Sequence, residues 1–335
     1  MKSTLAKMIC GLSLLFALSI SEPAAAKTVL KVASFTPKTN TIFSCGVVPM
    51  LDELAALDDV TLEGYYGGGA FGNATQQYDQ VARGITDMAF GITSYTEGQF
   101  PLTELITMPF AVGDLDSGTR ILNDTILPEF LGAEWQDVKV IHLWMTSLYQ
   151  IHTRKELKDP TNLSGLRIRS AGDVHLAAMQ ALGAQVSFIP SPQIYENLQK
   201  GVLDGIHGNW TTTIAFKVAE VTKHHYVTNM GTSIGFTVMN KKTYEALPAD
   251  AKAIVDKHSG TQASIKTSRC FLTSDGKAIE LAKNLGNVIH ELTPEQRQKM
   301  ADTVVPVIEK RLAELEARGL PARAVYDRII EERSK

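Results

Sequence analysis

The sequence predicts an α/β protein of two domains. Between Leu163 and Trp210 the chain alternates strand, helix, strand, helix and strand, and this βαβαβ order predicts a parallel sheet. Roughly 300 residues follow an N-terminal leader, which is more than one hydrophobic core usually holds. Beyond the leader, no apolar run is long enough to span a bilayer.

The leader has the pattern of a secretory signal peptide, which we assign to residues 1–26. Lys2 and Lys7 precede an apolar run over 8–20, and Ala24, Ala25 and Ala26 form a cleavage site before Lys27. The mature protein is therefore expected outside the cytoplasm. Removing two lysines and one glutamate changes the net charge from −3 to −4, which does not fit a nucleic-acid-binding protein.

The N-terminal half contains four predicted strands, at 29–35, 60–65, 87–92 and 138–145. The loop 67–72 matches the G-x-G-x-x-G pattern, and Asn73 is predicted to cap a helix that runs to Val81. The loop does not follow the first strand, and an exported chain meets little dinucleotide. We therefore interpret the glycines as a tight turn and not as a cofactor site.

In the central stretch, Leu166 and Ile168 belong to a short strand, and Asp173 is the predicted N-cap of a helix that Gly183 ends. A second strand follows at 185–189, and a second helix opens at Ser191 and Pro192. Ligands of parallel sheets bind beyond the carboxyl ends of the strands. Arg169 and residues 207–210 are expected to meet there.

The remaining chain is predicted to be mainly helical. A helix is expected over 211–221, and the alternating segment 233–239 predicts a strand that returns to the first domain. Helical patterns follow from Pro248 onward. Thr293 and Pro294 begin a late helix, and 319–321 separates the last two.

Several motifs together resemble one known family. They are L-S-G-L-R-I-R, A-L-G-A and Y-E-N-L-Q-K-G-V-L-D-G in the central stretch, and G-G-G-A-F-G-N, Q-V-A-R-G-I-T-D-M and M-P-F before it. This set is similar to the solute-binding proteins of tripartite ATP-independent periplasmic (TRAP) transporters, first described for C4-dicarboxylate uptake. The resemblance covers nearly the whole mature chain.

The resemblance implies two Rossmann-like lobes with a ligand cleft between them, as in type II periplasmic binding proteins. The first lobe would comprise 27–148 and 233–272, the second 149–232 and 273–335, and a long helix would span both. It also implies an organic-acid ligand, a periplasmic location, no cofactor, and a TRAP permease with small and large membrane subunits, driven by an ion gradient.

Arg169 is the main candidate for ligand binding. A guanidinium presents a planar pair of donors that fits a carboxylate. By chemistry alone, an arginine at a strand end is more often a structural ion-pair partner. The resemblance places Arg169 on the arginine that clamps the substrate carboxylate in relatives. Arg167 points to the same side but lies further from the carboxyl end, and we interpret it as structural.

Seven further residues are candidates for the pocket. Asn209, Trp210 and His207 follow the Asp-Gly pair, where relatives place a glutamate or asparagine in the cleft, although His207 also fits a core histidine. Phe35, Tyr95, Tyr149 and Phe236 lie at or near predicted strand ends or on the return strand, and each is also compatible with packing.

Tyr95 and Tyr149 stand near positions where some relatives carry additional arginines. Because this chain has no arginine at either place, the sequence favours a monocarboxylate with an aromatic or apolar remainder over a dianion.

Enzyme signatures are missing. The sequence contains no G-x-S-x-G, H-E-x-x-H, C-x-x-C or P-loop motif, and its eight histidines have no compact metal spacing. We therefore predict a binding protein without catalytic or metal-ligating residues. A sensor subunit of the same fold and an exported hydrolase remain alternatives. Cys45 and Cys270 could form a disulfide or remain free thiols.

Overall fold

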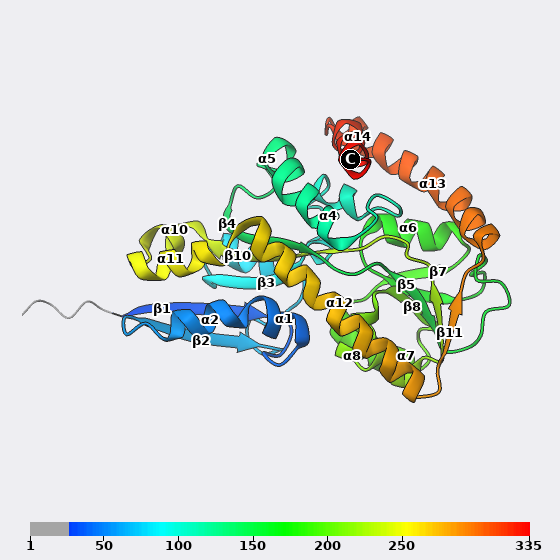
Figure 1. The fold of residues 1–335 in the computed structure, drawn as a ribbon, viewed down its shortest axis with the longest axis horizontal. Helices are drawn as coiled ribbons and strands as arrows, with labels where there is room; N and C mark the ends of the chain where they lie inside the picture. Colours follow the sequence, from blue (N-terminus) through cyan, green and yellow to red (C-terminus); the bar gives the residue numbers. More distant parts are fainter. Residues whose placement is uncertain (1–26) are drawn as a thin grey trace, which may run out of the picture.

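The structure, a computed structural model, describes residues 27–335, so the predicted leader lies outside the described residues. Two sheets form the cores of two lobes, one at each end of an elongated molecule (Figure 1). This arrangement confirms the predicted two-lobed α/β fold. We call the lobe built on the five-stranded sheet the first lobe and the lobe built on the six-stranded sheet the second.

The first lobe contains a mixed sheet in the order β2-β1-β3-β10-β4. Its strands are β1 (Thr28–Ser34), β2 (Val60–Tyr66), β3 (Met88–Ile92), β4 (Val138–Met145) and β10 (Ile234–Asn240). β1 is parallel to β2 and β3, whereas β10 is antiparallel to both of its neighbours. The insertion of β10 between β3 and β4 confirms that the chain returns to the first lobe after the central stretch.

The second lobe contains the order β11-β9-β5-β8-β6-β7. Its strands are β5 (Gln150–Thr153), β6 (Arg167–Ser170), β7 (Gln185–Phe188), β8 (Gly205–Gly208), β9 (His224–Val227) and β11 (Val288–Glu291). β6 is parallel to both β7 and β8. The predicted βαβαβ unit is therefore present, with β6 in its centre.

Helices cover both sheets. They are α1 (Thr41–Gly46), α2 (Val48–Ala55), α3 (Gln77–Ala82), α4 (Leu115–Arg120), α5 (Leu127–Phe130), α6 (Asp173–Ala181), α7 (Ile194–Gln199), α8 (Trp210–Ala215), α9 (Val218–Val221), α10 (Lys241–Ala246), α11 (Ala249–Lys257), α12 (Gly260–Asn284), α13 (Pro294–Ala317) and α14 (Ala322–Arg333). Short 3₁₀ segments lie at Thr93–Tyr95, Thr103–Thr107 and Ser191–Gln193, and a π-helical segment at Ile121–Ile126.

Several predicted helix ends were wrong. The N-cap of α6 is Gly172 with φ 87°, and Asp173 is already helical. Asn73 does not cap α3, because its side chain accepts a hydrogen bond from the backbone of Thr75 and turns the loop before the helix begins. The helix expected over 211–221 is divided into α8 and α9 at Lys217, which has a φ of 57°.

The chain crosses between the lobes at two adjacent segments. The backbone of Thr146 donates to Ser233 at 2.9 Å, and that of Tyr149 donates to Gly231 at 2.8 Å. The outgoing segment 146–149 and the returning segment 228–233 are thus paired by backbone hydrogen bonds.

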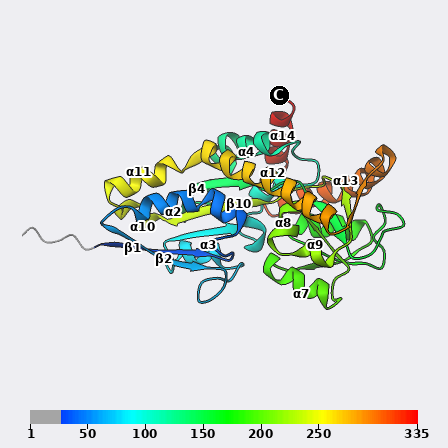
Figure 2. The ribbon, with the colours of Figure 1, turned by 60° about the horizontal axis from the view of Figure 1, so that its bottom comes forward.

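The long helix α12 is a third connection, and its two ends are attached to different lobes (Figure 2). Toward the first lobe, Ser268 Oγ lies 2.8 Å from Thr119 Oγ1, and a disulfide joins Cys270 to Cys45 on α1. Toward the second lobe, Asp275 accepts a hydrogen bond from the Thr211 backbone at 2.8 Å. The long helix implied by the resemblance is present, and the open question about the two cysteines is answered by a disulfide.

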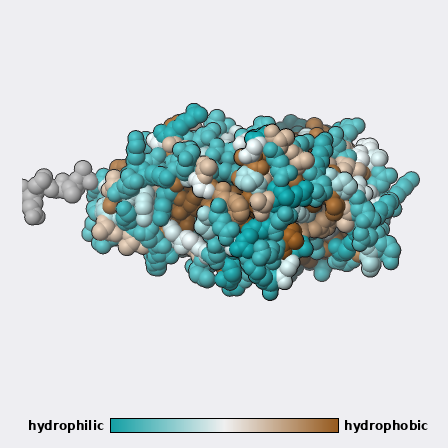
Figure 3. All heavy atoms as spheres, turned by 90° about the horizontal axis from the view of Figure 1, so that it is seen from above, coloured by the Kyte–Doolittle hydropathy of each residue, from teal (hydrophilic) through white to brown (hydrophobic). Residues whose placement is uncertain are grey.

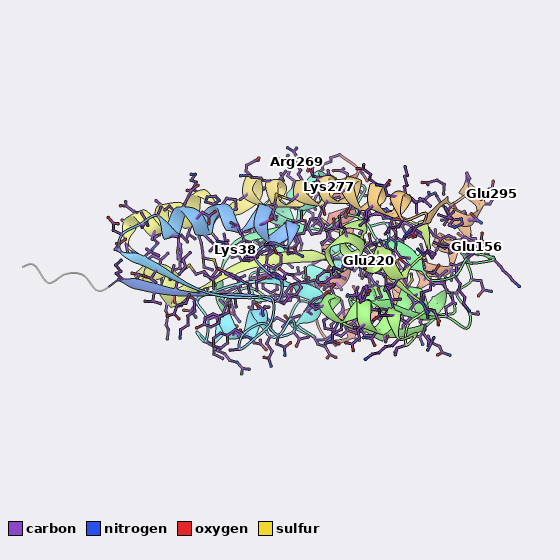
Figure 4. The ribbon with its side chains drawn as sticks, turned by 90° about the horizontal axis from the view of Figure 1, so that it is seen from below. Lys38, Glu156, Glu220, Arg269, Lys277 and Glu295 are labelled. Carbon is purple, nitrogen blue, oxygen red and sulfur yellow. A yellow bond between two sulfur atoms is a disulfide. The ribbon has the colours of Figure 1, made fainter. Side chains whose placement is uncertain are left out.

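The outer side of α12 faces solvent. Figure 4 shows Arg269 and Lys277 along this edge of the molecule. The face in Figure 3 is mostly hydrophilic, with hydrophobic residues in small separate groups. Within 27–335, no helix combines the length and apolar character needed to cross a membrane.

The chain ends on the first lobe. Thr293 caps α13 and Pro294 begins it, as predicted, and the structure adds a capping box between Thr293 and Gln296. α13 packs along α6 of the second lobe. Val325 and Ile329 of α14 belong to the hydrophobic core of the first lobe. We still propose the predicted lobe boundaries, but α14, within the segment 273–335 given to the second lobe, packs on the first lobe.

Candidate ligand-binding site

A cavity lies where the two lobes meet. It encloses about 540 Å³ that protein atoms leave free, including solvent at its mouth. Its lining comes from both lobes and from the crossing segments: Phe35, Thr36, Asn40, Ile42, Phe90, Ile92, Tyr95, Trp144, Thr146, Tyr149, Arg169, Ser191, Asn209, Thr211, Thr212, Ala215, Phe216, Ser233 and Phe271.

Aromatic rings form much of this lining. The rings of Phe90 and Trp144 stack with centroids 5.2 Å apart, and Trp144 stacks in turn on Phe271 at 5.4 Å. Trp144 fits because the facing residue on β10 is Gly235: a Cβ there would lie 1.9 Å from the indole ring. The cavity therefore offers broad apolar faces.

Arg169 supplies the positive charge of the cavity. It lies on β6 at the carboxyl end and is 2% exposed. Its Nε donates to the carbonyl oxygen of Ile189 at 2.6 Å, and Nη2 donates to the Tyr95 hydroxyl at 3.3 Å. Between residues 27 and 335, no carboxylate forms an ion pair with it.

Arg167, two residues earlier, has the opposite environment. Its side chain is half exposed, and its Nε and Nη2 donate to the two carboxylate oxygens of Asp204, each at 2.9 Å. The carboxylate of Asp204 in turn raises the pKa of Arg167. Arg167 is thus a surface ion-pair partner, as its interpretation as a structural residue anticipated.

Tyr149 brings a neutral phenol to the cavity. Burial raises its pKa to about 12, so that the hydroxyl keeps its proton at physiological pH. Its ring packs edge-on against His207, with centroids 5.1 Å apart, and at a tilt of 39° against His175, with centroids 5.2 Å apart. Tyr149 therefore contributes an apolar ring and a hydroxyl, with no additional charge.

Asn209 is the N-cap of α8. Its Oδ1 accepts from the backbone and the hydroxyl of Thr212, both at 2.9 Å, which caps the helix. These bonds use the carbonyl end of the amide. In the described part of the chain, no hydrogen bond engages its Nδ2 donors.

The structure brings five of the eight candidate residues together: Arg169, Asn209, Tyr95, Tyr149 and Phe35 all line the cavity. Trp210, Phe236 and His207 do not line it, and the expectation that they face the ligand is corrected. His207 is instead the core histidine that the sequence also allowed.

Each of these three has a packing reason. Trp210 turns away, toward His152 and His225, with ring centroids 5.0 Å from each. Phe236 directly follows Gly235 on β10, and Gly235 lies on the face of the sheet that carries Trp144. Because adjacent residues of a strand point to opposite faces, Phe236 points away from that face. His207 is fully buried behind Tyr149, where its ring nitrogens bond Ser170 Oγ at 3.1 Å and the Met230 carbonyl at 3.0 Å.

Sequence reasoning missed several wall residues. Phe90 and Trp144 lie within predicted strands, so alternation from Gly235 could have found them. Phe271 could not have been found, because it comes from α12, whose path across the cavity depends on packing. No cluster of three or more metal-ligating side chains occurs in 27–335.

Comparisons with known proteins agree with this architecture. The family model DctP, bacterial extracellular solute-binding protein, family 7, matches residues 60–315. The C4-dicarboxylate-binding periplasmic protein DctP of Vibrio cholerae is 29% identical over 212 residues. That match spans 62% of this chain and 62% of the relative, so it covers less than two thirds of the relative's own length.

Solved structures match over more of the chain. A TRAP solute-binding protein from a marine metagenome, described as specific for aromatic acid ligands and crystallised with 3-hydroxybenzoate, is 25% identical with a TM-score of 0.85. The match covers 92% of this chain and 99% of that one. A TRAP solute-binding protein from Rhodoferax ferrireducens, in complex with benzoate, is 24% identical with a TM-score of 0.84, covering 92% of this chain and 98% of that one.

The family match extends over most of the chain, and the same two-lobed architecture recurs in the solved TRAP proteins. The resemblance found in the sequence is thereby confirmed, and the chain belongs to the DctP family, the bacterial extracellular solute-binding proteins of family 7.

Proposed function

We propose that the protein is the periplasmic solute-binding component of a TRAP transporter and that it binds an aromatic monocarboxylate through Arg169. The observation that carries this proposal is a buried guanidinium, without a carboxylate partner in the described chain, at the edge of a cavity with aromatic walls. A buried charge is costly unless an opposite charge compensates it. A ligand carboxylate would supply that charge.

The number of charges in the cavity supports a single carboxylate. Arg169 is the only ionised group among the residues that line it, since Tyr95 and Tyr149 are phenols. A second carboxylate on the ligand would have no cationic partner there. A monoanion therefore fits the cavity better than a dicarboxylate.

The remainder of the ligand is proposed to be aromatic. Seven rings line the cavity: those of Phe35, Phe90, Tyr95, Trp144, Tyr149, Phe216 and Phe271. Flat apolar faces favour a flat apolar ligand through burial and ring contacts. The marine relative described as specific for aromatic acids supports the same class.

Delivery to a membrane permease would follow from lobe closure. Residues of both lobes line the cavity, so a ligand makes all its contacts only when the lobes are together. The ligand can shift the equilibrium toward closure only by its higher affinity for the closed form. The permease would recognise that form. No catalytic role is proposed.

Two measurements on the mature protein, from Lys27, test the proposal: a thermal-shift screen and then isothermal titration of the best ligand. A thermal-shift screen of aromatic acids, C4-dicarboxylates and sugar acids first identifies the ligand, because a ligand at about 100 times its Kd adds about 2.7 kcal/mol of stability. We expect aromatic monocarboxylates to give the largest shifts. A response confined to dicarboxylates or uncharged compounds would contradict the proposed ligand class.

Arg169→Ala is then expected to weaken binding of that acid by roughly 2–5 kcal/mol, as for the loss of one partner from a desolvated charge pair. Arg167→Ala is the matched control from the same strand, and its affinity is expected to equal that of the wild type because Arg167 bonds Asp204 outside the cavity. A loss of less than about tenfold in Arg169→Ala would place the carboxylate elsewhere.

A further inference from the structure

The hydroxyl of Tyr95 is a meeting point of the two lobes. Tyr95 belongs to the 3₁₀ segment that follows β3 in the first lobe, and it is 5% exposed. Its hydroxyl lies 2.7 Å from Ser191 Oγ, 3.2 Å from the Ser191 backbone nitrogen and 3.3 Å from Arg169 Nη2. All three partners belong to the second lobe.

The ring of Tyr95 also contacts both lobes. It packs edge-on against Phe35 of the first lobe, with centroids 5.6 Å apart, and against Phe188 at the end of β7, with centroids 5.7 Å apart. The ring contact with Phe188 and the three hydroxyl contacts all join the two lobes, so they depend on the lobes being close together.

Counting donors shows what the hydroxyl can do. A phenol has one proton and two acceptor sites. The N–H groups of Ser191 and Arg169 are directed at the oxygen and can occupy both acceptor sites. The phenol proton then goes to Ser191 Oγ, or to an acceptor that lies beside Arg169.

Arg169 is held in place by the same arrangement. The Ile189 carbonyl accepts from Nε, and Tyr95 accepts from Nη2. A guanidinium has five N–H donors in one plane, so three remain for a ligand. Because one fixed partner comes from each lobe, the orientation of this plane depends on closure.

We infer that Tyr95 is a positioning residue that couples lobe closure to the orientation of the Arg169 guanidinium. This inference rests on the proposed carboxylate site. In the closed form, the Tyr95 oxygen replaces water on one donor of Arg169 and leaves the remaining donors aligned for the carboxylate. In the open form, the oxygen is withdrawn with the first lobe, and Arg169 loses this partner.

Tyr95→Phe tests the inference because it removes only the hydroxyl and keeps the ring between Phe35 and Phe188. Binding of 3-hydroxybenzoate is expected to weaken by at least tenfold, chiefly through faster dissociation. Tyr78→Phe is the matched control: Tyr78 is also buried, but its hydroxyl donates to the Glu134 carbonyl at 3.1 Å within the first lobe. Its affinity is expected to stay within twofold of the wild type.

The coupling between Tyr95 and lobe closure is measured independently of affinity, as a distance between the two lobes. Spin labels on cysteines introduced at Glu63 of β2 and Gln199 of α7, both exposed, report this distance, since Cys45 and Cys270 are already bonded to each other. With saturating 3-hydroxybenzoate, Tyr95→Phe is expected to show a smaller closed population than wild type or Tyr78→Phe. A closed population and an affinity equal to those of wild type would overturn the inference.

The same measurement separates this inference from the proposed function. If the wild type binds no aromatic acid, the proposed ligand class fails. The ligand-free distances then decide the role of Tyr95: a shift toward larger separation in Tyr95→Phe supports it, and identical distances overturn it.

Discussion

At the scale of single residues, the shape of the cavity depends on a glycine, Gly235. Gly235 faces the indole of Trp144, which is stacked between Phe90 and Phe271. A methyl group at position 235 would overlap that ring, and its nearest atom would lie 1.9 Å away. The ring cannot move without disturbing its two neighbours, which also line the cavity.

Gly235→Ala is therefore expected to destabilise the protein by about 1–3 kcal/mol, as for other overpacked cores, and to weaken ligand binding. Gly276→Ala on α12 is the control, because no atom outside the helix's own backbone lies within 4 Å of the added carbon. It should stabilise the helix by up to about 1 kcal/mol. Urea denaturation of the wild type and both variants checks the prediction. A midpoint of Gly235→Ala equal to that of the wild type would show that the Trp144 ring can shift freely.

The two arginines of β6 show what residue-level reasoning could reach. Strand alternation places Arg167 and Arg169 on one side, and proximity to the carboxyl end distinguishes them. The sequence could not show that Asp204 neutralises one while the other is buried without a carboxylate partner in 27–335. That difference depends on which loops pack against each end of the strand.

At the scale of elements, α12 is fixed to the first lobe by a covalent bond. The disulfide between Cys270 and Cys45 closes a loop with a sequence separation of 225 residues, and their Cα atoms are 6.3 Å apart. A cross-link over so long a segment restricts the unfolded chain strongly. Ile42 of α1 and Phe271 of α12, near the two cysteines, both line the cavity.

The double variant Cys45→Ser/Cys270→Ser is expected to lose about 2–5 kcal/mol of stability. Denaturation with and without a reducing agent provides the comparison: the reductant should lower the midpoint of the wild type and leave the variant unchanged. A wild-type midpoint that does not respond to complete reduction would contradict a stabilising role.

Some elements with strong periodicity or a clear cap were predicted correctly. The strands of the central stretch and the start of α13 at Thr293 and Pro294 follow from local sequence. The errors at Asn73 and Asp173 have a common cause. Asn73 bonds its own loop, and Asp173, already inside the helix, pairs with Arg311 of α13 at 3.1 Å. The local sequence does not distinguish such partners from those of a true N-cap.

At the scale of the whole molecule, stability is expected to decrease in acid because several histidines are buried. Burial lowers the pKa of His142 to about 3, and those of His175 and His225 to about 4. The pKa values of His152 and His207 are also well below normal, again because of burial. Below pH of about 6.5 the unfolded chain binds protons that the folded chain does not.

Each such histidine therefore reduces the free energy of unfolding by up to about 1.4 kcal/mol per pH unit below 6.5, until its own folded pKa is reached. Urea midpoints measured from pH 7.5 to pH 5 are expected to fall steadily. Constant midpoints over this range would show that the histidines become protonated without unfolding.

Glu104 acts in the opposite direction. Burial raises its pKa to about 7, so between its unfolded value of 4.5 and pH 7 the folded chain holds a proton that the unfolded chain has lost. Its contribution to stability thus increases as the pH falls through this window. Glu104→Gln removes that compensation and should make the loss of stability between pH 7 and pH 5 steeper. A shallower slope would reverse the assigned sign.

The sequence by itself determined the α/β class, the two lobes, the parallel unit around β6 and the position of Arg169 at a strand end. These features depend on periodicity, chain length and local caps, which neighbouring residues fix. Only the tertiary structure decided that Cys45 meets Cys270, that Trp210, Phe236 and His207 face away from the cavity, and that Tyr95 contacts Arg169. Those outcomes depend on how separate elements pack against one another, and contacts between distant segments leave no local pattern in the chain.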